Sequence, residues 1–570
     1  MLCRRQYNPF VSSAYLQRLK TPFILFDTIQ ISIHISCNRL QLLVKFMVSD
    51  FVIAGAGHNS LITACYLAKA GYSCTVIDAR DVPGGGCATE EIFGAGYKID
   101  TCSTGHTLIL QNPIISQDEL GLVDEFGLSY LHPDPVAHVA FPDGEQITMT
   151  LDPEKTAEEF SRYSRRDADS YLRLLQEFDE LKPMLGRARS EPLGLGSSLK
   201  QLLLDHKRGP IWLRRQAMSA RDVILREFES KHIRAFMGWM SFQTAVPIDQ
   251  AGTGFLPYQI TAPRQARSWS IPKGGSGKLT DALVAYLKRK GTNIELNKKV
   301  EKLIFDHDHC VGVSCSDGTE YRSKKGVVST IHIKHLINMA PDKYWDENFK
   351  FGVDTYNVGV PFFATYLATT TAPIFETANG PVSAVSAGYA GWLEDLVQSG
   401  RDIYDGKLSD DVSWLLVATP TLVDPERAVD NHHTVKLLTH TVYDLPQVGA
   451  IGWNSFKEEF TDKLLEKVRR FCPSFTDDVI LKRLTKSPLD IEKWNPHMIN
   501  GAPHGGDRSI TFAGEQRPVP GWAQHRMPIQ GLWQTGGTTH PGGSITGYPG
   551  RNAAKVILSD LGLKPSDFMV

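Results

Sequence analysis

Hydrophobic and polar positions near residue 50 predict a buried strand, a helix and a second buried strand in close succession. Residues 51–53 are consecutive and apolar, as expected for a parallel strand covered on both faces. A helix is expected from about His58 to Ala70, with apolar positions Leu61, Ile62, Cys65 and Leu67, and Gly71 is its stop signal. The next apolar run, Cys74–Ile77, ends at Asp78. This order predicts an α/β domain built on a parallel sheet.

Later patterns predict a second, mixed part of the chain. Residues 156–185 show helical spacing at Phe160, Tyr163, Tyr171, Leu172, Leu175 and Phe178, and residues 221–240 are a second helical candidate. Strand-like runs follow at 362–367, 412–418 and 434–441, and we expect them to form a sheet that roofs the site. A strand is also expected over 294–300, with another at 311–313 that leads into a hairpin at Asp317-Gly318.

Two glycines between the first strand and the first helix indicate a dinucleotide site. Gly55 permits the tight turn, and Gly57 lets the backbone approach a pyrophosphate held at the helix N-terminus. Asp78 can accept hydrogen bonds from a ribose hydroxyl, and its charge would repel the 2′-phosphate of NADP. Ser60 replaces the third glycine of the fingerprint, and it is small enough to keep helix and strand close.

A second glycine turn favours FAD over NAD. Gly84, Gly85 and Gly86 begin six residues after Asp78, where a plain NAD unit would run into another helix. With the segments GAGHNS, PKGGSGKL and THPGG…GRNAA, this turn makes the chain similar to the phytoene desaturase-related family of FAD oxidoreductases. That family includes carotenoid desaturases and pyridine nucleotide-disulfide oxidoreductase domain protein 2. The similar motifs spread over most of residues 47–562.

The resemblance implies a set of cofactor contacts. It places Gly55, Gly57 and Asn59 at the pyrophosphate, with His58 and Ser60 in the same turn, Asp78 and Ala79 at the adenosine ribose, Gly84 and Gly85 along the phosphate and ribityl chain, Val300 at the adenine, and Gly536, Gly537, Gly543, Ser544 and Ile545 at the ribityl and isoalloxazine end. Two positions depart from the family: Gly86 stands where relatives often have Arg, and Gly537 where many flavoproteins have Asp. Since residues 531–562 contain no cysteine, we expect FAD to be bound non-covalently.

The C-terminal segment predicts a helix with a chemical role. Residues 550–561 should be helical, with Pro549 suited to the helix start. The positive end of this helix, aimed at the flavin N1–C2 edge, would stabilise the charge that develops when N5 accepts a hydride; alternatively, the neighbouring glycines only close a turn. His540 is a candidate base beside this turn, and the competing interpretation is a histidine that shapes the turn by hydrogen bonding.

Three other patterns are weighed and set aside. GGSGKLT resembles a phosphate loop, but Pro272 stands where its first glycine should be, and Leu279 replaces the Ser or Thr that binds magnesium. Cys310 and Cys315 have C-x4-C spacing, yet they lie in an expected strand, where residues five apart face opposite sides. His504, His525 and His540 lack metal-ligand spacing, so no metal is expected.

Composition and charge restrict the classes of partner and the cellular compartment that we expect. Among 570 residues, 61 are basic and 63 acidic, and this balance argues against a nucleic-acid partner. Nine scattered cysteines favour a reducing compartment, the cytoplasm, without a disulfide framework. Residues 1–46 carry basic Arg4, Arg5, Arg18, Lys20, Arg39 and Lys45 against Asp27 alone. They are expected to be either a disordered extension ahead of Met47 or a mitochondrial targeting peptide, which would change the predicted location. The apolar run at 23–35 is too short to span a membrane; peripheral membrane contact stays open.

These observations predict a Rossmann-like FAD domain from residues 47–110, 272–335 and 500–562, and an α+β substrate domain from 111–271 and 336–499. The predicted activity is an FAD-dependent dehydrogenase or desaturase that removes hydride from a C–H bond of an apolar or mixed organic metabolite. Oxygen, a quinone or another acceptor would reoxidise the flavin. One alternative is a flavin amine oxidase, for which Trp533 and Tyr548 are the candidate aromatics. Another is a flavin-less binding protein like the Rab GDP-dissociation inhibitors, which would be colourless where the enzyme is yellow.

Overall fold

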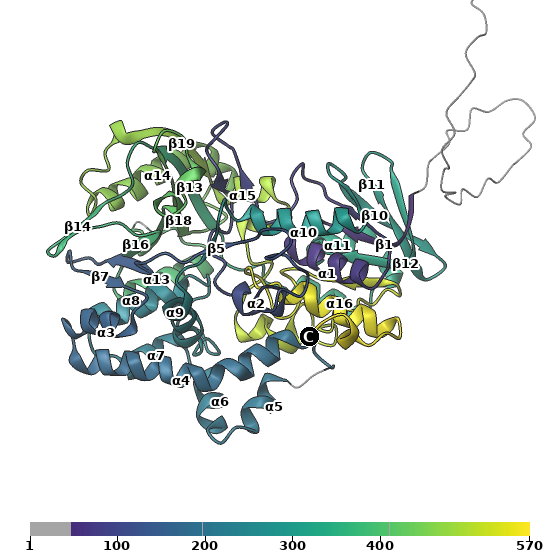
Figure 1. Cartoon of the computed structure of the whole chain (residues 1–570), viewed down its shortest axis with the longest axis horizontal. Helices are drawn as coiled ribbons and strands as arrows, with labels where there is room; N and C mark the ends of the chain where they lie inside the picture. The colour runs from purple at the N-terminus through teal and green to yellow at the C-terminus, as the bar shows by residue number, and fades with distance from the viewer. Residues whose placement is uncertain (1–46, 196–197, 410) are drawn as a thin grey trace, which may run out of the picture. The chain divides into compact units, whose positions relative to one another are not determined.

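The computed structural model describes residues 47–195, 198–409 and 411–570, so the two expectations for residues 1–46 lie outside the described part. A seven-stranded mixed sheet has the order β10-β11-β12-β1-β2-β9, with β20 also paired to β12 (Figure 1). Its strands are β1 (Met47–Ala54), β2 (Cys74–Ile77), β9 (Asn293–Glu295), β10 (Val300–Asp306), β11 (His309–Cys315), β12 (Glu320–Ser329) and β20 (Leu532–Gln534). β1 pairs in parallel with both β2 and β12, in register Ile53 to Val76 and Ile53 to Val328.

Helices cover both faces of this sheet. On one face α1 (His58–Lys69), α10 (Gly277–Arg289) and α16 (Tyr548–Asp560) bury a core with alternate sheet residues such as Phe51 and Ile53. On the other face α11 (Ile333–Leu336) and α12 (Glu347–Asp354) pack against Val52, Ala54 and Ile77. Because the strands are buried on both sides, their sequence is continuously apolar rather than alternating. The predicted Rossmann-like fold is confirmed, and its strands come from the three segments assigned to the FAD domain.

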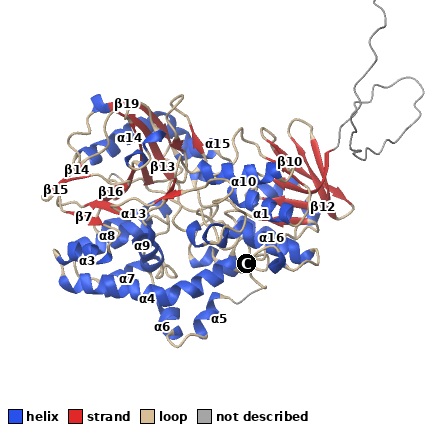
Figure 2. Cartoon of the chain, viewed as in Figure 1, coloured by secondary structure: helices blue, strands red, loops and turns tan. Residues whose placement is uncertain are grey.

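A second sheet carries the substrate part, with the order β19-β13-β18-β17-β16-β6-β7 (Figure 2). Its strands are β6 (Ala137–Ala140), β7 (Gln146–Met149), β13 (Phe362–Thr369), β16 (Ser386–Ala390), β17 (Trp414–Ala418), β18 (His433–His440) and β19 (Ile480–Lys486). One face packs on α14 (Trp453–Arg469), and part of the other shares a hydrophobic core with α4 (Arg165–Ser190), α8 (Lys231–Phe242) and α9 (Leu256–Arg267). The three strands expected from the sequence, β13, β17 and β18, are confirmed and are neighbours.

Both long helices expected in the substrate part are broken, and capping explains why. Residues 156–185 form α3 (Pro153–Ser161) and α4 (Arg165–Ser190), because the Ser164 side chain accepts the N–H of Asp167 and starts a new helix. Residues 221–240 form α7 (Ala220–Glu227) and α8 (Lys231–Phe242). At this break the N–H groups of Glu229 and Ser230 donate to the Asp167 carboxylate, at 2.9 and 2.8 Å. A distant residue therefore interrupts a periodic pattern.

The strand expected over 294–300 is also two strands, β9 and β10. The chain turns between them at Asn297, whose φ is +58°, and Lys298 N–H donates to the Asp78 carbonyl at 2.7 Å. The hairpin at Asp317-Gly318 and the C-terminal helix are confirmed as the β11–β12 turn and α16. The remaining elements are α2 (Pro113–Ser116), α5 (Leu199–Leu204), α6 (Gly209–Ala217), α13 (Leu393–Tyr404), α15 (Pro488–Trp494) and the short strands β3 (Thr89–Glu90), β4 (Ile99–Asp100), β5 (Tyr130–Leu131), β8 (Ile271–Pro272), β14 (Phe375–Thr377) and β15 (Gly380–Val382). None of the helices in the described ranges has the length and apolarity that crossing a bilayer requires.

Candidate FAD and substrate site

A single cavity of about 820 Å³ connects the first glycine turn with the second sheet. Its volume lies in the upper part of the range of about 300–1,000 Å³ that small-molecule sites occupy. Every residue that the sequence proposed for cofactor binding, except Ser60, lines it: Gly55, Gly57, His58, Asn59, Asp78, Ala79, Gly84, Gly85, Val300, Gly536, Gly537, Gly543, Ser544 and Ile545. Six separate stretches of the chain are thus brought to one site.

The two glycines of the first turn have different reasons to be glycine. Gly55 has φ +108°, and a Cβ there would lie 2.2 Å from Thr330 Cγ2, so the protein itself requires glycine. Gly57 has φ −67°, and a Cβ there would meet only Ser60 Oγ at 3.9 Å and Thr330 Oγ1 at 4.0 Å. The space next to Gly57 therefore belongs to the cavity, as expected where backbone approaches a diphosphate at a helix N-terminus.

Ser60 explains how the turn survives without the third glycine. Its side chain is fully buried, and its hydroxyl lies 2.6 Å from the Gly55 carbonyl and 2.8 Å from the Gly57 carbonyl. The hydroxyl thus acts on the protein side of the turn rather than in the cavity. Asn59 links the turn to the C-terminal helix, because its amide oxygen accepts the Gly550 N–H at 3.3 Å.

Asp78 faces the cavity at the end of β2. One carboxylate oxygen accepts the Ala56 N–H at 2.6 Å and the other accepts the Arg80 N–H at 2.8 Å, so the acid also fixes the glycine turn. Burial raises the pKa of this carboxyl above its ordinary value, against the lowering effect of those two backbone donors. Free lone pairs of a carboxylate held in this way can accept a ribose hydroxyl.

The C-terminal glycines allow close contacts that bring α16 to the site. A Cβ at Gly543 would lie 2.2 Å from the His504 carbonyl, and one at Gly550 would lie 2.2 Å from the Asn59 carbonyl. Thr63 Oγ1 donates to the Gly550 carbonyl at 2.9 Å, which ties α1 to α16. The start of α16 follows the cavity-lining residue Ile545 by three positions, so its N-terminal dipole lies at this end of the site.

His540 does not line the cavity. Its Nε2–H donates to the Ala188 carbonyl at 3.0 Å, which leaves Nδ1 unprotonated, and burial lowers the pKa of the ring to about 4. This geometry favours the turn-shaping interpretation over the candidate base. Trp533 and Tyr548 are likewise outside the lining: Trp533 Nε1–H donates to Asp560 at 2.9 Å, and the Tyr548 hydroxyl donates to the Gln111 carbonyl at 3.3 Å. The aromatics proposed for an amine oxidase are therefore the wrong ones.

The GGSGKLT segment is held by contacts within the protein. In the GGSGKLT segment the backbone donors already have partners, since Gly274 N–H donates to Asp424 at 2.6 Å, Ser276 N–H to Asp100 at 2.8 Å and Gly277 N–H to Thr89 at 2.9 Å. No phosphate is needed there. Cys310 and Cys315 are free, buried thiols on β11. Within the described ranges, no three His, Cys, Asp or Glu side chains form a metal-binding group.

The sequence missed the substrate half of the cavity. Its wall is made by alternate residues of three adjacent strands: Phe362, Ala364 and Tyr366 on β13, Trp414 and Leu416 on β17, and Lys436 and Leu438 on β18. The intervening residues, such as Phe363, Leu415 and Leu437, pack towards α14. Gln243, Ile260, Pro263, Arg264, Trp269 and Arg508 complete this half from other segments. Period-two alternation in the three predicted strands was the one sequence signal for this wall.

Comparison with known proteins agrees with this geometry. Residues 61–358, just over half of the chain, match the model of the flavin containing amine oxidoreductases. The chain belongs to this family. As a flavin-containing amine oxidoreductase, it is similar to a limonene dehydrogenase polypeptide of Castellaniella defragrans, at 25% identity over 90% of this chain and 95% of that protein. It is also similar to mouse pyridine nucleotide-disulfide oxidoreductase domain-containing protein 2, at 26% identity, 90% of this chain and 94% of the relative.

Further relatives span two chemistries. Phytoene desaturase (neurosporene-forming) of Rhodobacter capsulatus is 24% identical over 87% of this chain and 90% of its own. Among solved structures, putrescine oxidase bound to putrescine has a TM-score of 0.57 at 15% identity, covering 90% of this chain and 99% of the other. Cyclohexylamine oxidase from Brevibacterium oxydans has a TM-score of 0.56 at 15% identity, with coverages of 90% and 99%. These two structures support the fold.

This flavin-containing amine oxidoreductase is an FAD-dependent oxidoreductase. The residues fit the cofactor: free space beside Gly57, a carboxylate at the end of β2 and close-approach glycines at the start of α16 meet at one cavity. The resemblance noted from the sequence is confirmed, and the flavin-less binding protein is set aside. The individual cofactor contacts stay predictions.

Proposed function

We propose that the protein is a dehydrogenase or desaturase that takes hydride from a C–H bond of a largely apolar organic molecule. The observation that carries this proposal is the lining of the substrate half. Phe362, Trp414, Leu416 and Leu438 supply aromatic and aliphatic surface from one sheet. Among the described residues that line the cavity, the carboxylates are Asp78 and Glu301, and both lie at the adenosine end with Val300. An ammonium group would find basic rather than acidic partners near this sheet.

FAD, when bound, supplies the acceptor for the hydride. The chain's own residues orient the substrate and exclude water, which strengthens every polar interaction inside the site. Trp414 is held rigidly for this purpose, because it stacks on His440 with ring centroids 4.3 Å apart and its Nε1–H donates to the Trp239 carbonyl at 3.0 Å. A fixed aromatic wall restricts the poses available to an apolar substrate.

Lys436 is a positioning residue in this arrangement. Its ammonium donates to the Cys102 carbonyl at 2.7 Å and to Thr104 Oγ1 at 2.6 Å, and it lies 3.4 Å from the Asp100 carbonyl. All three donors of the ammonium are thereby used to hold residues 100–104, of which 101–104 line the cavity, against β18. Burial lowers the pKa of Lys436 to about 8, although the Asp100 charge opposes this shift.

The names of the relatives support this class of reaction. A limonene dehydrogenase polypeptide and several phytoene desaturases are similar over about nine-tenths of the chain, and their names describe oxidation of hydrocarbons. The same fold is present in putrescine oxidase and cyclohexylamine oxidase, so amine oxidation is the competing outcome. Oxygen or a quinone would reoxidise the flavin, and we propose neither acceptor in preference to the other.

The test is anaerobic reduction of the bound flavin. Purified holoenzyme is mixed with cyclic monoterpenes, long polyenes and matched primary amines, and loss of the flavin visible absorbance is recorded. We expect a compound with a largely apolar body and no ammonium group to bleach the flavin, and the amines to leave it oxidised. Bleaching by amines alone would refute the proposal in favour of an amine oxidase.

Two neighbouring residues give a matched pair of variants. Leu416 lines the cavity and Val417 packs towards α14, and both are buried on β17. Leu416→Ala should change the KM of whichever substrate reduces the flavin, whereas Val417→Ala should lower stability without a selective effect on KM. Equal effects of the two substitutions on KM would place the substrate elsewhere.

A further inference from the structure

The basic side chains that line the cavity fall into two groups. At the adenosine end the basic residues are Arg80, Lys298, Lys299 and Lys302, of which Arg80 pairs with Glu90 at 3.2 Å and Lys298 pairs with Asp317 at 2.5 Å. In the substrate half the basic residues are Arg264, Lys436 and Arg508. Lys436 is fully engaged by backbone and hydroxyl oxygens, as described above. Within the described residues, neither Arg264 nor Arg508 makes an ion pair with a carboxylate.

Arg264 is the more unusual of the two. It lies one turn before the end of α9 with 7% of its surface exposed. Its guanidinium donates to the Gln243 amide oxygen, lies 3.8 Å from the Met240 sulfur, and stands 5.5 Å from the centre of the Trp269 ring. All three partners are neutral. A guanidinium carries five donors, so several remain for the cavity that it lines.

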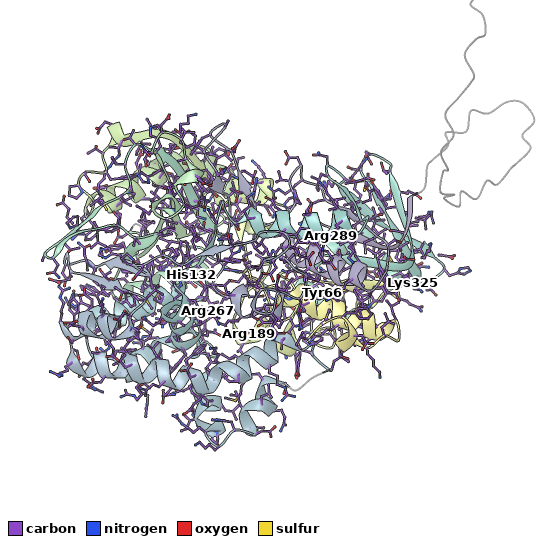
Figure 3. The ribbon with its side chains drawn as sticks, viewed as in Figure 1. Tyr66, His132, Arg189, Arg267, Arg289 and Lys325 are labelled. Atoms are coloured by element: carbon purple, nitrogen blue, oxygen red, sulfur yellow. The ribbon has the colours of Figure 1, made fainter. Side chains whose placement is uncertain are left out.

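Burying a cation without an anion is costly for the protein. Burial lowers the pKa of Arg264 to about 9 and that of Arg508 to about 10. The positive charges of Arg517 and Arg189 also act to lower the pKa of Arg508. Figure 3 labels Arg189, which belongs to α4. Buried charges are normally paired, and an Arg fork suits a carboxylate or a phosphate. The missing partner is therefore expected to be an anion brought by a ligand.

Arg508 lies on the cofactor side of this pair. One of its N–H groups is 3.3 Å from Ser544 Oγ, in the turn predicted to approach the flavin. Arg264 instead neighbours Ile260, Pro263 and Trp269, which come from the substrate part. We therefore assign the ligand anion to Arg264 and expect Arg508 to add a favourable positive field.

We propose that the substrate is an apolar molecule that bears one anionic group, and that Arg264 is the specificity-determining residue that binds this group. The apolar body then lies along Phe362, Trp414 and Leu416 while the anion fixes which C–H bond faces the flavin. This inference rests on the proposed function, since it names the substrate class of the same site. A carboxylate and a phosphate share the required chemistry.

Binding of probes without turnover tests the proposal. Holoenzyme is titrated with decanoate, decyl phosphate, methyl decanoate and decylamine, and perturbation of the flavin visible spectrum gives each Kd. We expect the anions to bind about tenfold to a hundredfold more tightly than the ester, which is the effect of one charge-assisted contact. The tighter of the two anions identifies the head group. Equal binding of ester and anions, or no binding of any probe, would overturn the proposal.

Substitutions on one helix provide the control. Arg264→Met should remove the preference for anions and leave methyl decanoate binding unchanged, and Arg264→Lys should restore part of the preference. Arg267→Met removes the same charge three residues later on α9, outside the cavity lining (Figure 3 labels Arg267). This substitution should change neither the Kd of the anions nor the Kd of methyl decanoate. Equal losses in the Arg264→Met and Arg267→Met proteins would refute a specific contact. Because these measurements need no hydride transfer, their failure is distinct from failure of the flavin-bleaching experiment.

Discussion

The substitution Gly57→Ala tests the assignment of the glycine turn most directly, because the structure separates its effect on folding from its effect on FAD. Gly57 has φ −67°, and the new Cβ would have its closest contact, at 3.9 Å, with Ser60 Oγ. A methyl group at a helix N-cap loses a little capping preference but also restricts the unfolded chain. These two terms nearly offset, so the free energy of unfolding of the apoprotein should change by no more than about 1 kcal/mol.

The effect on FAD should be much larger. The methyl group enters the cavity at the position predicted for the diphosphate, and it displaces the phosphate from the N–H groups of the turn. Losing one charge-assisted hydrogen bond costs about 1.5–3 kcal/mol, which corresponds to about a 10- to 150-fold higher Kd. Fluorescence quenching of added FAD measures this Kd, and thermal unfolding with and without FAD provides a second reading. Free FAD at 100 times Kd stabilises the native protein by about 2.7 kcal/mol, so the variant should show a smaller shift.

Gly55→Ala is the matched control. Gly55 has φ +108° and its Cβ would lie 2.2 Å from Thr330 Cγ2. The backbone strain alone costs about 1–3 kcal/mol, and Thr330 must also move. This variant should therefore lose stability even without FAD. If Gly57→Ala bound FAD like the wild type, or destabilised the apoprotein as much as Gly55→Ala, the argument for a diphosphate beside Gly57 would be wrong.

Three further predictions concern charge. Asp78→Asn keeps a side chain of the same shape but removes the anionic acceptor, and it should raise the FAD Kd by about tenfold or more in the same quenching assay. Glu119→Gln should lower the free energy of unfolding in urea by about 3–5 kcal/mol, because it breaks a pair with Arg551 in which both side chains are 1% exposed and two N–H groups donate at 2.6 and 2.9 Å. The exposed pair Arg289–Glu125 is the comparison, and Glu125→Gln should lower the free energy of unfolding by less than about 1 kcal/mol. Figure 3 labels Arg289, and it labels Tyr66, whose hydroxyl also donates to Glu119. Burial would raise the pKa of Glu119, but hydrogen bonding and the charge of Arg551 outweigh it and hold the pKa below its ordinary value. The stabilisation should therefore be present above about pH 4.3 and be lost as the pH falls through the lower folded pKa, so the stability gap between wild type and Glu119→Gln should narrow in acid.

Several local predictions held because they depend on neighbours in the sequence. Residues 51–53, the two glycines and Asp78 lie within one strand–helix–strand unit, and a backbone turn of this kind leaves few alternatives. The same is true of Pro549 at the start of α16 and of the Asp317-Gly318 turn. Helix boundaries failed where a distant side chain intervened, as when the Asp167 carboxylate caps residues 229 and 230.

The choice among candidate site residues needed contacts between distant segments. His540, Trp533 and Tyr548 are close in sequence to the glycines of the C-terminal turn, but their side chains point to Ala188, Asp560 and Gln111. Arg264 is one arginine among many in the sequence, and nothing in its neighbours distinguishes it from Arg267. Arg264 becomes a candidate ligand-binding residue only when α9 is packed beside Gln243 and Trp269 and no carboxylate of the described residues lies opposite the guanidinium.

The amino-acid sequence by itself therefore determined the cofactor class and predicted the half of the site that would hold it, because FAD binding relies on short backbone motifs with fixed glycine and acid positions. The tertiary structure decided the substrate half. That half is assembled from β13, β17, β18 and α9, whose residues are separated by up to about 180 positions. The tertiary structure alone shows that Arg264 is buried there without a carboxylate partner among the described residues, which is the observation from which we infer an anionic ligand.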